Sequence, residues 1–117
     1  MNYTISEIGL KVKSAAPTAK AVSIIRKYRD SSMAEIISDI KDGNYILKST
    51  VISHPGVRMI RKCYDELIKS GIEAELYERD QLITRELVSN LIKSHRQTDR
   101  EVAMQVEKEA TEQEPAE

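Results

Sequence analysis

The chain has 117 residues, of which 40% are apolar and 32% charged, with five Tyr and no Phe or Trp. This length and composition predict one globular domain with a core of Ile, Val, Leu and Met, and they argue against a disordered chain. A single Cys excludes an internal disulfide, and with two His it is too few for a conventional zinc site. No apolar run could span a bilayer and the first residues do not resemble a signal peptide, so we expect a cytoplasmic protein without membrane contact.

The net charge of -1 averages two unlike regions. Residues 98–117 carry seven acidic and two basic side chains, a net charge of -5. Residues 1–97 are left with 16 basic and 12 acidic side chains, a net charge of +4. We therefore predict a domain in residues 1–97 and an acidic, disordered tail in residues 98–117. The alternative is that residues 100–110 extend the last helix.

The first elements follow from the spacing of apolar residues. Residues 8–14, IGLKVKS, alternate in polarity as a half-buried strand does. Thr18 is the expected N-cap of a first helix over residues 18–29. The apolar residues of that helix recur at helical spacing and share one face: Ala21, Val22, Ile25 and Tyr28. A strand followed by an amphipathic helix is thus predicted for the first 29 residues.

A second short helix and a second strand come next. Residues 33–40 have apolar side chains at helical spacing, with Ser31 or Ser32 as the expected cap. Asp42, Gly43 and Asn44 end this helix with turn-forming side chains. Residues 45–52 are rich in β-branched side chains and predict a strand.

The third helix and third strand complete the predicted core. Pro55 is suited to the first turn of a helix, which makes His54 the expected N-cap. Gly71 is placed as the left-handed residue that ends the helix. Residues 72–78, IEAELYE, alternate as a third strand.

A fourth helix is predicted over residues 81–97, where His95 lies at a fraying, solvated end. Its apolar face comprises Leu82, Ile83, Leu87, Val88, Leu91 and Ile92. The order β-α-α-β-α-β, then α, predicts an α+β two-layer sandwich with a three-stranded antiparallel sheet and an extra C-terminal helix. We expect the first three helices on one face of the sheet. The fourth covers the other face or an edge of the sheet, or pairs with a second copy in a homo-oligomer.

The stretch SHPGVRMIRKC, residues 53–63, holds the residues most suggestive of catalysis. His54 and Cys63 are nine positions apart, which on one helix is roughly 180° of rotation and ~13 Å of rise, so they cannot form a catalytic dyad. Cys63 lies on the apolar face and is expected in the core. Asp65 and Glu66, between Lys62 and Lys69, fit a solvated face with ion pairs along the helix. With no cofactor motif, we expect no enzyme, no cofactor and no metal.

An anion site is the second interpretation of this stretch. The amides of Gly56 and Val57 at a helix N-terminus, with Arg58 and Arg61 nearby, would favour negative charge. His54 would be part of such a site, although Pro55 removes one donor. The alternative for His54 is a residue at the helix start that makes a local hydrogen bond or meets solvent.

The first helix has a basic surface. It has no acidic residue between Thr18 and Arg29. We predict a partner-binding surface of Lys20, Val22, Ile25, Arg26, Lys27 and Arg29. Such a surface suits an acidic patch of a partner protein or nucleic-acid phosphates, and a merely solvated face is the alternative.

The order of elements, the helical run AVSIIRKYR and the ending YDELIKSGIEAELYE resemble the C-terminal domain of the bacterial large-subunit ribosomal stalk protein. The resemblance covers residues 8–78. The family's first helix has the pattern Val-x-x-Ile-Lys-x-x-Arg, which Val22, Ile25, Arg26 and Arg29 match. The family's Gly-rich turn between the first two helices is DSSM here, and Ile37 stands where a basic residue is expected. With a fourth helix and an acidic tail added, we expect a stand-alone relative of the domain.

In the stalk family the first helix and the start of the second bind translation GTPases. The resemblance therefore implies a non-enzymatic protein-interaction module, an adaptor that docks on a translation GTPase or the ribosome. One alternative is a nucleic-acid-binding protein that uses the basic helix faces, although no aromatic stacking platform is evident. Its residues would be Lys20, Arg26, Lys27, Arg29, Arg58, Arg61 and Lys62. A ClpS-type protease adaptor, which has a similar fold, is a weaker alternative.

Overall fold

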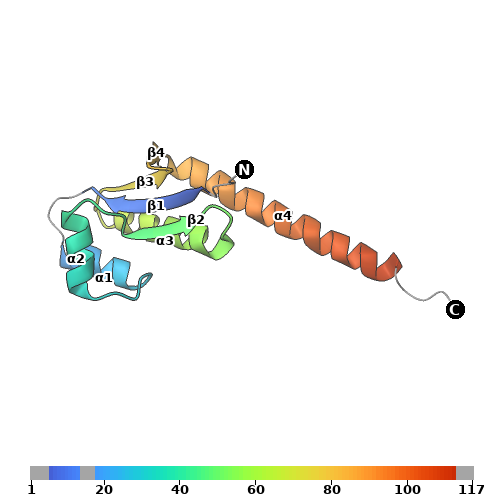
Figure 1. Ribbon diagram of the computed structural model, residues 1–117, viewed down its shortest axis with the longest axis horizontal. Helices are drawn as coiled ribbons and strands as arrows, with labels where there is room; N and C mark the ends of the chain where they lie inside the picture. The colour runs from blue at the N-terminus through green and yellow to red at the C-terminus, as the bar shows by residue number, and fades with distance from the viewer. Residues whose placement is uncertain (1–5, 14–17, 113–117) are drawn as a thin grey trace, which may run out of the picture.

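The computed structural model describes residues 6–13 and 18–112, with side-chain placement through residue 98. The elements in chain order are β1 (Glu7–Val12), α1 (Ala19–Arg26), α2 (Met33–Lys41), β2 (Leu47–Thr50), α3 (His54–Lys69), β3 (Ala74–Glu78), β4 (Gln81–Ile83) and α4 (Arg85–Glu112). All strand pairs are antiparallel, in the order β2-β1-β3-β4. The described part of the chain is thus an α+β fold with one four-stranded sheet (Figure 1).

The sheet has one strand more than the sequence predicts. Residues 81–83, assigned above to the fourth helix, form β4, and Leu82 pairs with Tyr77 instead of joining an apolar helix face. Arg79 and Asp80 connect β3 to β4 with φ values of 50° and 63°. Two-residue hairpins of this kind usually contain Gly or Asn, which tolerate positive φ. Because neither residue is present, the hairpin has no recognisable turn signal in the sequence.

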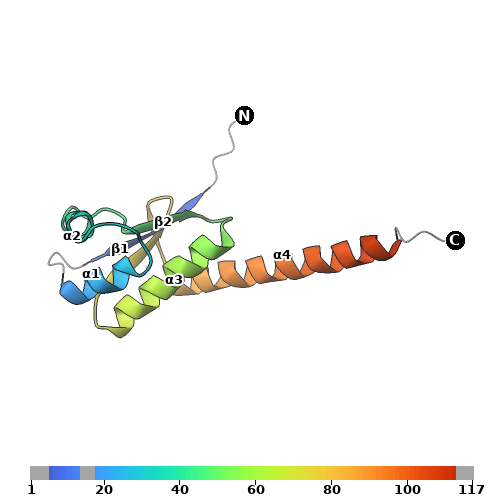
Figure 2. The same cartoon turned by 90° about the horizontal axis from the view of Figure 1, so that it is seen from below.

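The helices form a layer on one face of the sheet. Figures 1 and 2 show α3 lying across the strands, with α1 on one side of it and α4 on the other. α2 packs on α1 at the end of this layer. The last helix does not cover the other face or an edge of the sheet as predicted, because α4 packs beside α3 in the same layer, where Val88 and Ile92 join the core. The other face of the sheet is left open by the described helices.

The core lies between the sheet and the helices. β1 places Ile8, Leu10 and Val12 on the helix side, as alternation predicts. Their neighbours in the core include Ile25, Ile36, Ile46, Ile60, Cys63, Leu67 and Leu76. Cys63 is fully buried and free, so its predicted place in the core is confirmed.

The helix caps confirm most of the predicted starts. Thr18 accepts a hydrogen bond from the amide of Ala21, and Ser32 accepts one from the amide of Glu35. The predicted cap of α3 is wrong, because Ser53 and not His54 accepts the amide of Gly56. A serine hydroxyl is among the preferred N-cap groups, and this shifts His54 into the first turn. Gly71, which follows α3, has the expected positive φ of 80°.

α4 continues to Glu112, so it includes residues 98–112 of the segment for which disorder was the expectation and helix extension the alternative. The segment is rich in Ala, Glu, Gln, Lys and Met, which are strong helix formers. The remaining residues of that segment lie outside the described residues. In Figures 1 and 2 this half of α4 projects beyond the sheet. Across the described residues, no helix is both long and apolar enough to cross a membrane.

Candidate docking surface at the first two helices

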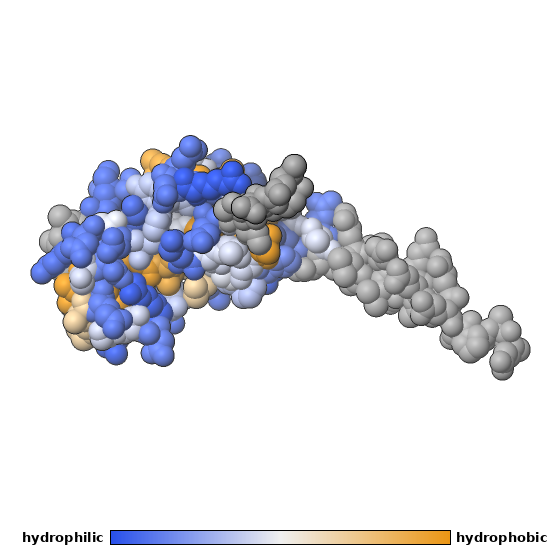
Figure 3. Space-filling model, viewed as in Figure 1, coloured by the Kyte–Doolittle hydropathy of each residue, from blue (hydrophilic) through white to orange (hydrophobic). Residues whose placement is uncertain are grey.

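A surface hollow lies along α1, next to the first residue of α2. α1 directs Ala21, Val22, Ile24 and Ile25 into the core, which leaves its polar side on the surface. The hollow has a volume of about 370 Å³. Its lining residues are Ala19, Val22, Ser23, Arg26, Lys27 and Met33. Figure 3 shows apolar surface among hydrophilic residues over these two helices, and Met33 is one of the exposed apolar side chains, at 49%.

Two of the predicted contact residues belong to the core. Ile25 is 0% exposed, so its prediction as a partner-binding residue is wrong. Its side chain continues the apolar face that α1 packs against the sheet and α3. Val22 is also buried, at 2%, but it lines the hollow and provides apolar surface at its floor.

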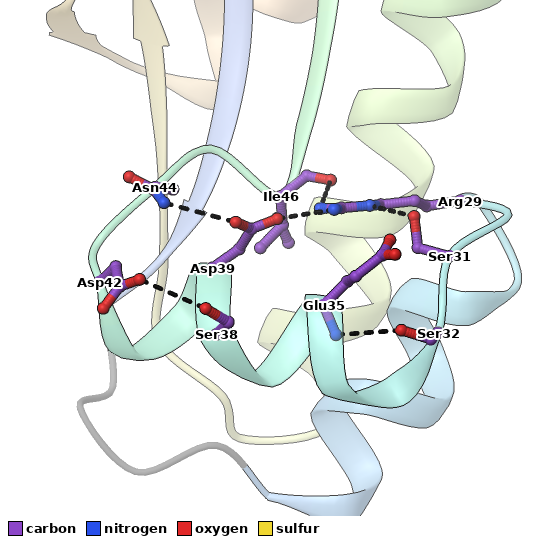
Figure 4. Close-up of polar contacts among 9 residues, drawn as sticks. All are labelled: Arg29, Ser31, Ser32, Glu35, Ser38, Asp39, Asp42, Asn44 and Ile46. Atoms are coloured by element: carbon purple, nitrogen blue, oxygen red, sulfur yellow. Dashed lines mark hydrogen bonds and ion pairs between the residues drawn. The ribbon is translucent and has the colours of Figure 1, made fainter.

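Arg29 makes three polar contacts inside the domain. Its guanidinium contacts Asp39 Oδ2 at 2.6 Å, and its Nε donates to Ser31 Oγ at 2.7 Å. Nη1 also donates to the carbonyl of Ile46 at 3.2 Å. Figure 4 shows that these contacts join the turn after α1, the middle of α2 and the chain before β2. All three donor nitrogens of Arg29 are used inside the domain, which argues against its predicted role as a partner contact.

Lys27 has an acidic neighbour on a different helix. Its Nζ lies 3.1 Å from Glu66 Oε2 on α3, and the hydroxyl of Tyr28 donates to the other oxygen of the same carboxylate. The Tyr28 hydrogen bond first, and Lys27 second, lower the pKa of Glu66. The acidic pair on α3 was expected to form ion pairs along its own helix. Instead, Glu66 reaches α1, and Asp65 pairs with Arg85 of α4 at 2.6 Å.

Lys20 and Arg26 remain as unpaired cations beside the hollow. Both side chains are exposed, and neither makes a hydrogen bond or ion pair with another residue whose side chain is described. Arg26 lines the hollow itself, and Lys20 lies on the same short helix. The predicted surface therefore reduces to two free cations, a partly neutralised Lys27 and an apolar floor.

The two amides of the anion site predicted at the start of α3 already have hydrogen-bond partners. The amide of Gly56 donates to Ser53 Oγ and that of Val57 to the carbonyl of Ser53, so both donors are used by the cap. A Cβ on Gly56 would lie 2.0 Å from Ser49 Oγ, which shows how closely β2 approaches this turn. Arg58 and Arg61 are thus left without the two amides on which the site depended.

The two histidines meet across helices α3 and α4. The rings of His54 and His95 stack with centroids 3.9 Å apart and an angle of 14°. His95 is only 8% exposed, so its predicted solvated position is wrong. The sequence places these residues 41 positions apart, and only the packing of α4 on α3 brings them together.

Cys63 is expected to be chemically inert in the folded protein. Burial, with a smaller contribution from Glu66, raises the pKa of its thiol to about 12, so the thiol stays protonated near pH 8. Because the thiolate is the reactive form, we expect disulfide-exchange labelling at pH 8 to be more than about a hundredfold slower in the native than in the unfolded protein. Equal rates in buffer and in denaturant would contradict this placement.

A cluster on the open face of the sheet was missed in the sequence. Tyr45 and Tyr77 meet edge to face with ring centroids 5.9 Å apart, and Lys11 lies over both rings. No aromatic platform was predicted, because the three residues come from three separate segments. The detectable signal was the alternation of β1 and β3, which places Lys11 and Tyr77 opposite the core residues.

The surface at α1 and the start of α2 can support binding through charge and apolar contact. In the part of the chain with described side chains, no group of three or more His, Cys, Asp or Glu residues could hold a metal ion. Comparisons with protein families, with characterised proteins and with solved structures found no match. The functional conclusion therefore depends on the geometry of the surfaces and on the resemblance stated above.

Proposed function

We propose that the chain is a non-enzymatic protein-interaction module that binds an acidic segment of a partner protein in the hollow along α1, next to the start of α2. The observation that carries the proposal is an apolar floor, formed by Val22 and Met33, beside the unpaired cations Lys20 and Arg26. Apolar contact supplies affinity in such a hollow, and the cations select and attract an acidic partner.

The resemblance to the ribosomal stalk domain supports a translation GTPase or the ribosome as the partner class. The matching pattern consists of Val22, Ile25, Arg26 and Arg29, of which Val22 and Arg26 line the hollow. Ile25 and Arg29 contribute indirectly, because they hold α1 and α2 in position. The working contact set is therefore Lys20, Val22, Arg26, Lys27 and Met33.

Reversing the two free charges is expected to weaken partner binding. We expect Lys20→Glu/Arg26→Glu to bind purified translation GTPases or ribosomes at least about tenfold more weakly than the wild type, because attraction becomes repulsion at the rim. Binding of purified components, measured by biolayer interferometry at two salt concentrations, checks this result.

A matched control is available on α3. Arg58→Glu/Lys62→Glu makes the same charge change at exposed positions outside the hollow, and we expect its binding to stay close to wild type. Equal loss in both double variants would indicate a general charge effect. Unchanged binding by Lys20→Glu/Arg26→Glu would refute the proposed surface.

The nucleic-acid alternative on the basic helix faces receives less support from the geometry. Arg29 is enclosed by its contacts with Asp39 and Ile46, and Lys27 is paired with Glu66. Two of the seven cations proposed to contact nucleic acid are therefore engaged within the domain. The other five are divided between α1 and α3.

A further inference from the structure

The open face of the sheet carries a tyrosine cluster, formed by Tyr45, Tyr77, Lys11 and Lys48. The Lys11 ammonium lies 4.6 Å from the ring centroid of Tyr45 and 4.9 Å from that of Tyr77. Lys48 lies 5.3 Å from the Tyr45 centroid. In Figures 1 and 3 this face is turned to the viewer, and Figure 1 shows α3 behind the strands. Two aromatic rings and two cations thus share one surface that no described helix covers.

Gly9 allows this cluster to form. It stands in register between Tyr77 of β3 and Lys48 of β2, on the outer face of β1. A Cβ at this position would lie 2.4 Å from the ring of Tyr45, so only glycine leaves space for that ring on the strand. The ring is also held at its far end, because the Tyr45 hydroxyl donates to Asp80 at 2.6 Å. Tyr45 is therefore fixed in place against the sheet.

Three carboxylates lie beside the cluster, of which only that of Glu7 pairs with a cation, whereas those of Asp80 and Glu75 accept tyrosine hydroxyls. Glu7 pairs with Lys48 at 3.2 Å, Asp80 accepts the Tyr45 hydroxyl, and Glu75 accepts the Tyr77 hydroxyl at 3.1 Å. Lys11 makes no ion pair with any residue that has a described side chain and contacts the two rings instead. Its positive charge is available to an incoming anion.

A surface hollow adjoins the cluster. Its volume is about 380 Å³, and its lining residues are Ser6, Glu7, Ile8, Gly9, Tyr45, Lys48, Arg79 and Asp80. Arg79 and Asp80 both have positive φ because they form the two-residue turn that joins β3 to β4. This turn places the Arg79 guanidinium at the hollow, where its Nε donates to Ser6 Oγ at 2.6 Å.

We propose that this face binds single-stranded nucleic acid. Lys11, which lies over both rings, would move from them to a phosphate. Unpaired bases would then stack in its place on Tyr77 and Tyr45, with Lys48 and Arg79 as further phosphate contacts. Sheet surfaces that bind single-stranded nucleic acid combine aromatic rings with cations, and any base can stack on a ring. A duplex keeps its bases stacked inside the helix, so it could offer this surface only its phosphates. The Glu7–Lys48 pair is exposed and costs little to exchange for a phosphate contact.

Binding of short fluorescent oligonucleotides to the full chain tests the proposal. The probes are ten-residue oligouridylate and oligodeoxythymidylate, with a duplex of equal length, measured by fluorescence anisotropy at 50 and 200 mM salt. We expect both single strands to bind more tightly than the duplex, and the higher salt to weaken binding about tenfold for two to three phosphate contacts. Tyr77→Ala should weaken binding about tenfold, since one base loses its stacking partner.

Matched variants separate this surface from a general charge effect. Lys11→Gln is expected to weaken the binding of the single strands and to reduce its dependence on salt. Lys62→Gln and Tyr64→Ala, both on α3, should leave the affinity and its salt dependence unchanged. If Tyr77→Ala does not fold, Lys11→Gln still tests the surface, because it leaves both tyrosine rings in place. The proposal is overturned if wild type fails to bind at 50 mM salt, if the duplex binds as tightly as the single strands, or if Lys11→Gln and Lys62→Gln behave alike.

Discussion

Replacing Ile25 by Ala is expected to lower the free energy of unfolding by about 2–5 kcal/mol, the range for removing a large aliphatic side chain from a packed core. Ile25 is 0% exposed and belongs to the core cluster between α1, α3 and the sheet. Its neighbours cannot fully close the space that the truncated side chain leaves. Urea unfolding followed by circular dichroism measures the effect.

Ile52→Ala is the matched control for this substitution. The same atoms are removed, but Ile52 is 63% exposed, so we expect a change within about 0.5 kcal/mol. If Ile25→Ala were as stable as wild type and yet failed to bind a partner, Ile25 would be a contact residue and its place in the core would be incorrect.

Replacing Arg29 by Ala is expected to cost about 2–3 kcal/mol of stability, the second-largest effect. The substitution removes a charged group that makes three contacts, and it leaves the carboxylate of Asp39 without its cation. The Arg29 and Asp39 side chains are 23% and 24% exposed, so solvent replaces the lost contacts only in part. Thermal and urea unfolding of the purified variant measure the loss.

A double-mutant cycle with Asp39→Ala isolates the ion pair. We expect the double variant to lose less stability than the sum of the single variants, because the second substitution removes the unpaired charge that the first creates. Arg26→Ala is the control, with a predicted change within about 0.5 kcal/mol at an exposed position. Equal destabilisation by Arg26→Ala and Arg29→Ala would contradict the distinction between them.

These two residues change how the stalk-like pattern is interpreted. Val22, Ile25, Arg26 and Arg29 look equivalent in the sequence, since all four fit one spacing on one helix. In the structure, Ile25 packs in the core, Arg29 joins three segments, and Arg26 lines the hollow. A family pattern on a short helix can thus combine residues that maintain the fold with residues that contact a partner.

The contacts of Arg29 could not be predicted from its own segment. Its partners are Asp39, ten residues later, and the carbonyl of Ile46, seventeen residues later. Helical periodicity assigns a residue to a face, but it does not show what packs against that face. The same limitation explains His95, which looks solvated at the end of an apolar pattern and is covered by stacking on His54.

The sequence by itself determined the properties that depend on near neighbours along the chain. Apolar spacing located β1, β3 and the first three helices, and β-branched residues indicated β2. Side-chain chemistry identified the cap Thr18, limited the second cap to Ser31 or Ser32, and identified the left-handed Gly71. The position of Cys63 on an apolar helix face was enough to place it in the core. Each of these features follows from interactions within about one helical turn.

The tertiary structure alone decided which distant residues meet. It added β4 through a hairpin without Gly or Asn, placed α4 beside α3, and brought Tyr45 over Gly9 on the open face of the sheet. It also divided the basic first helix into free cations, paired cations and core residues. These outcomes depend on strand register and on the packing of segments far apart in the chain, which no local pattern of side chains encodes.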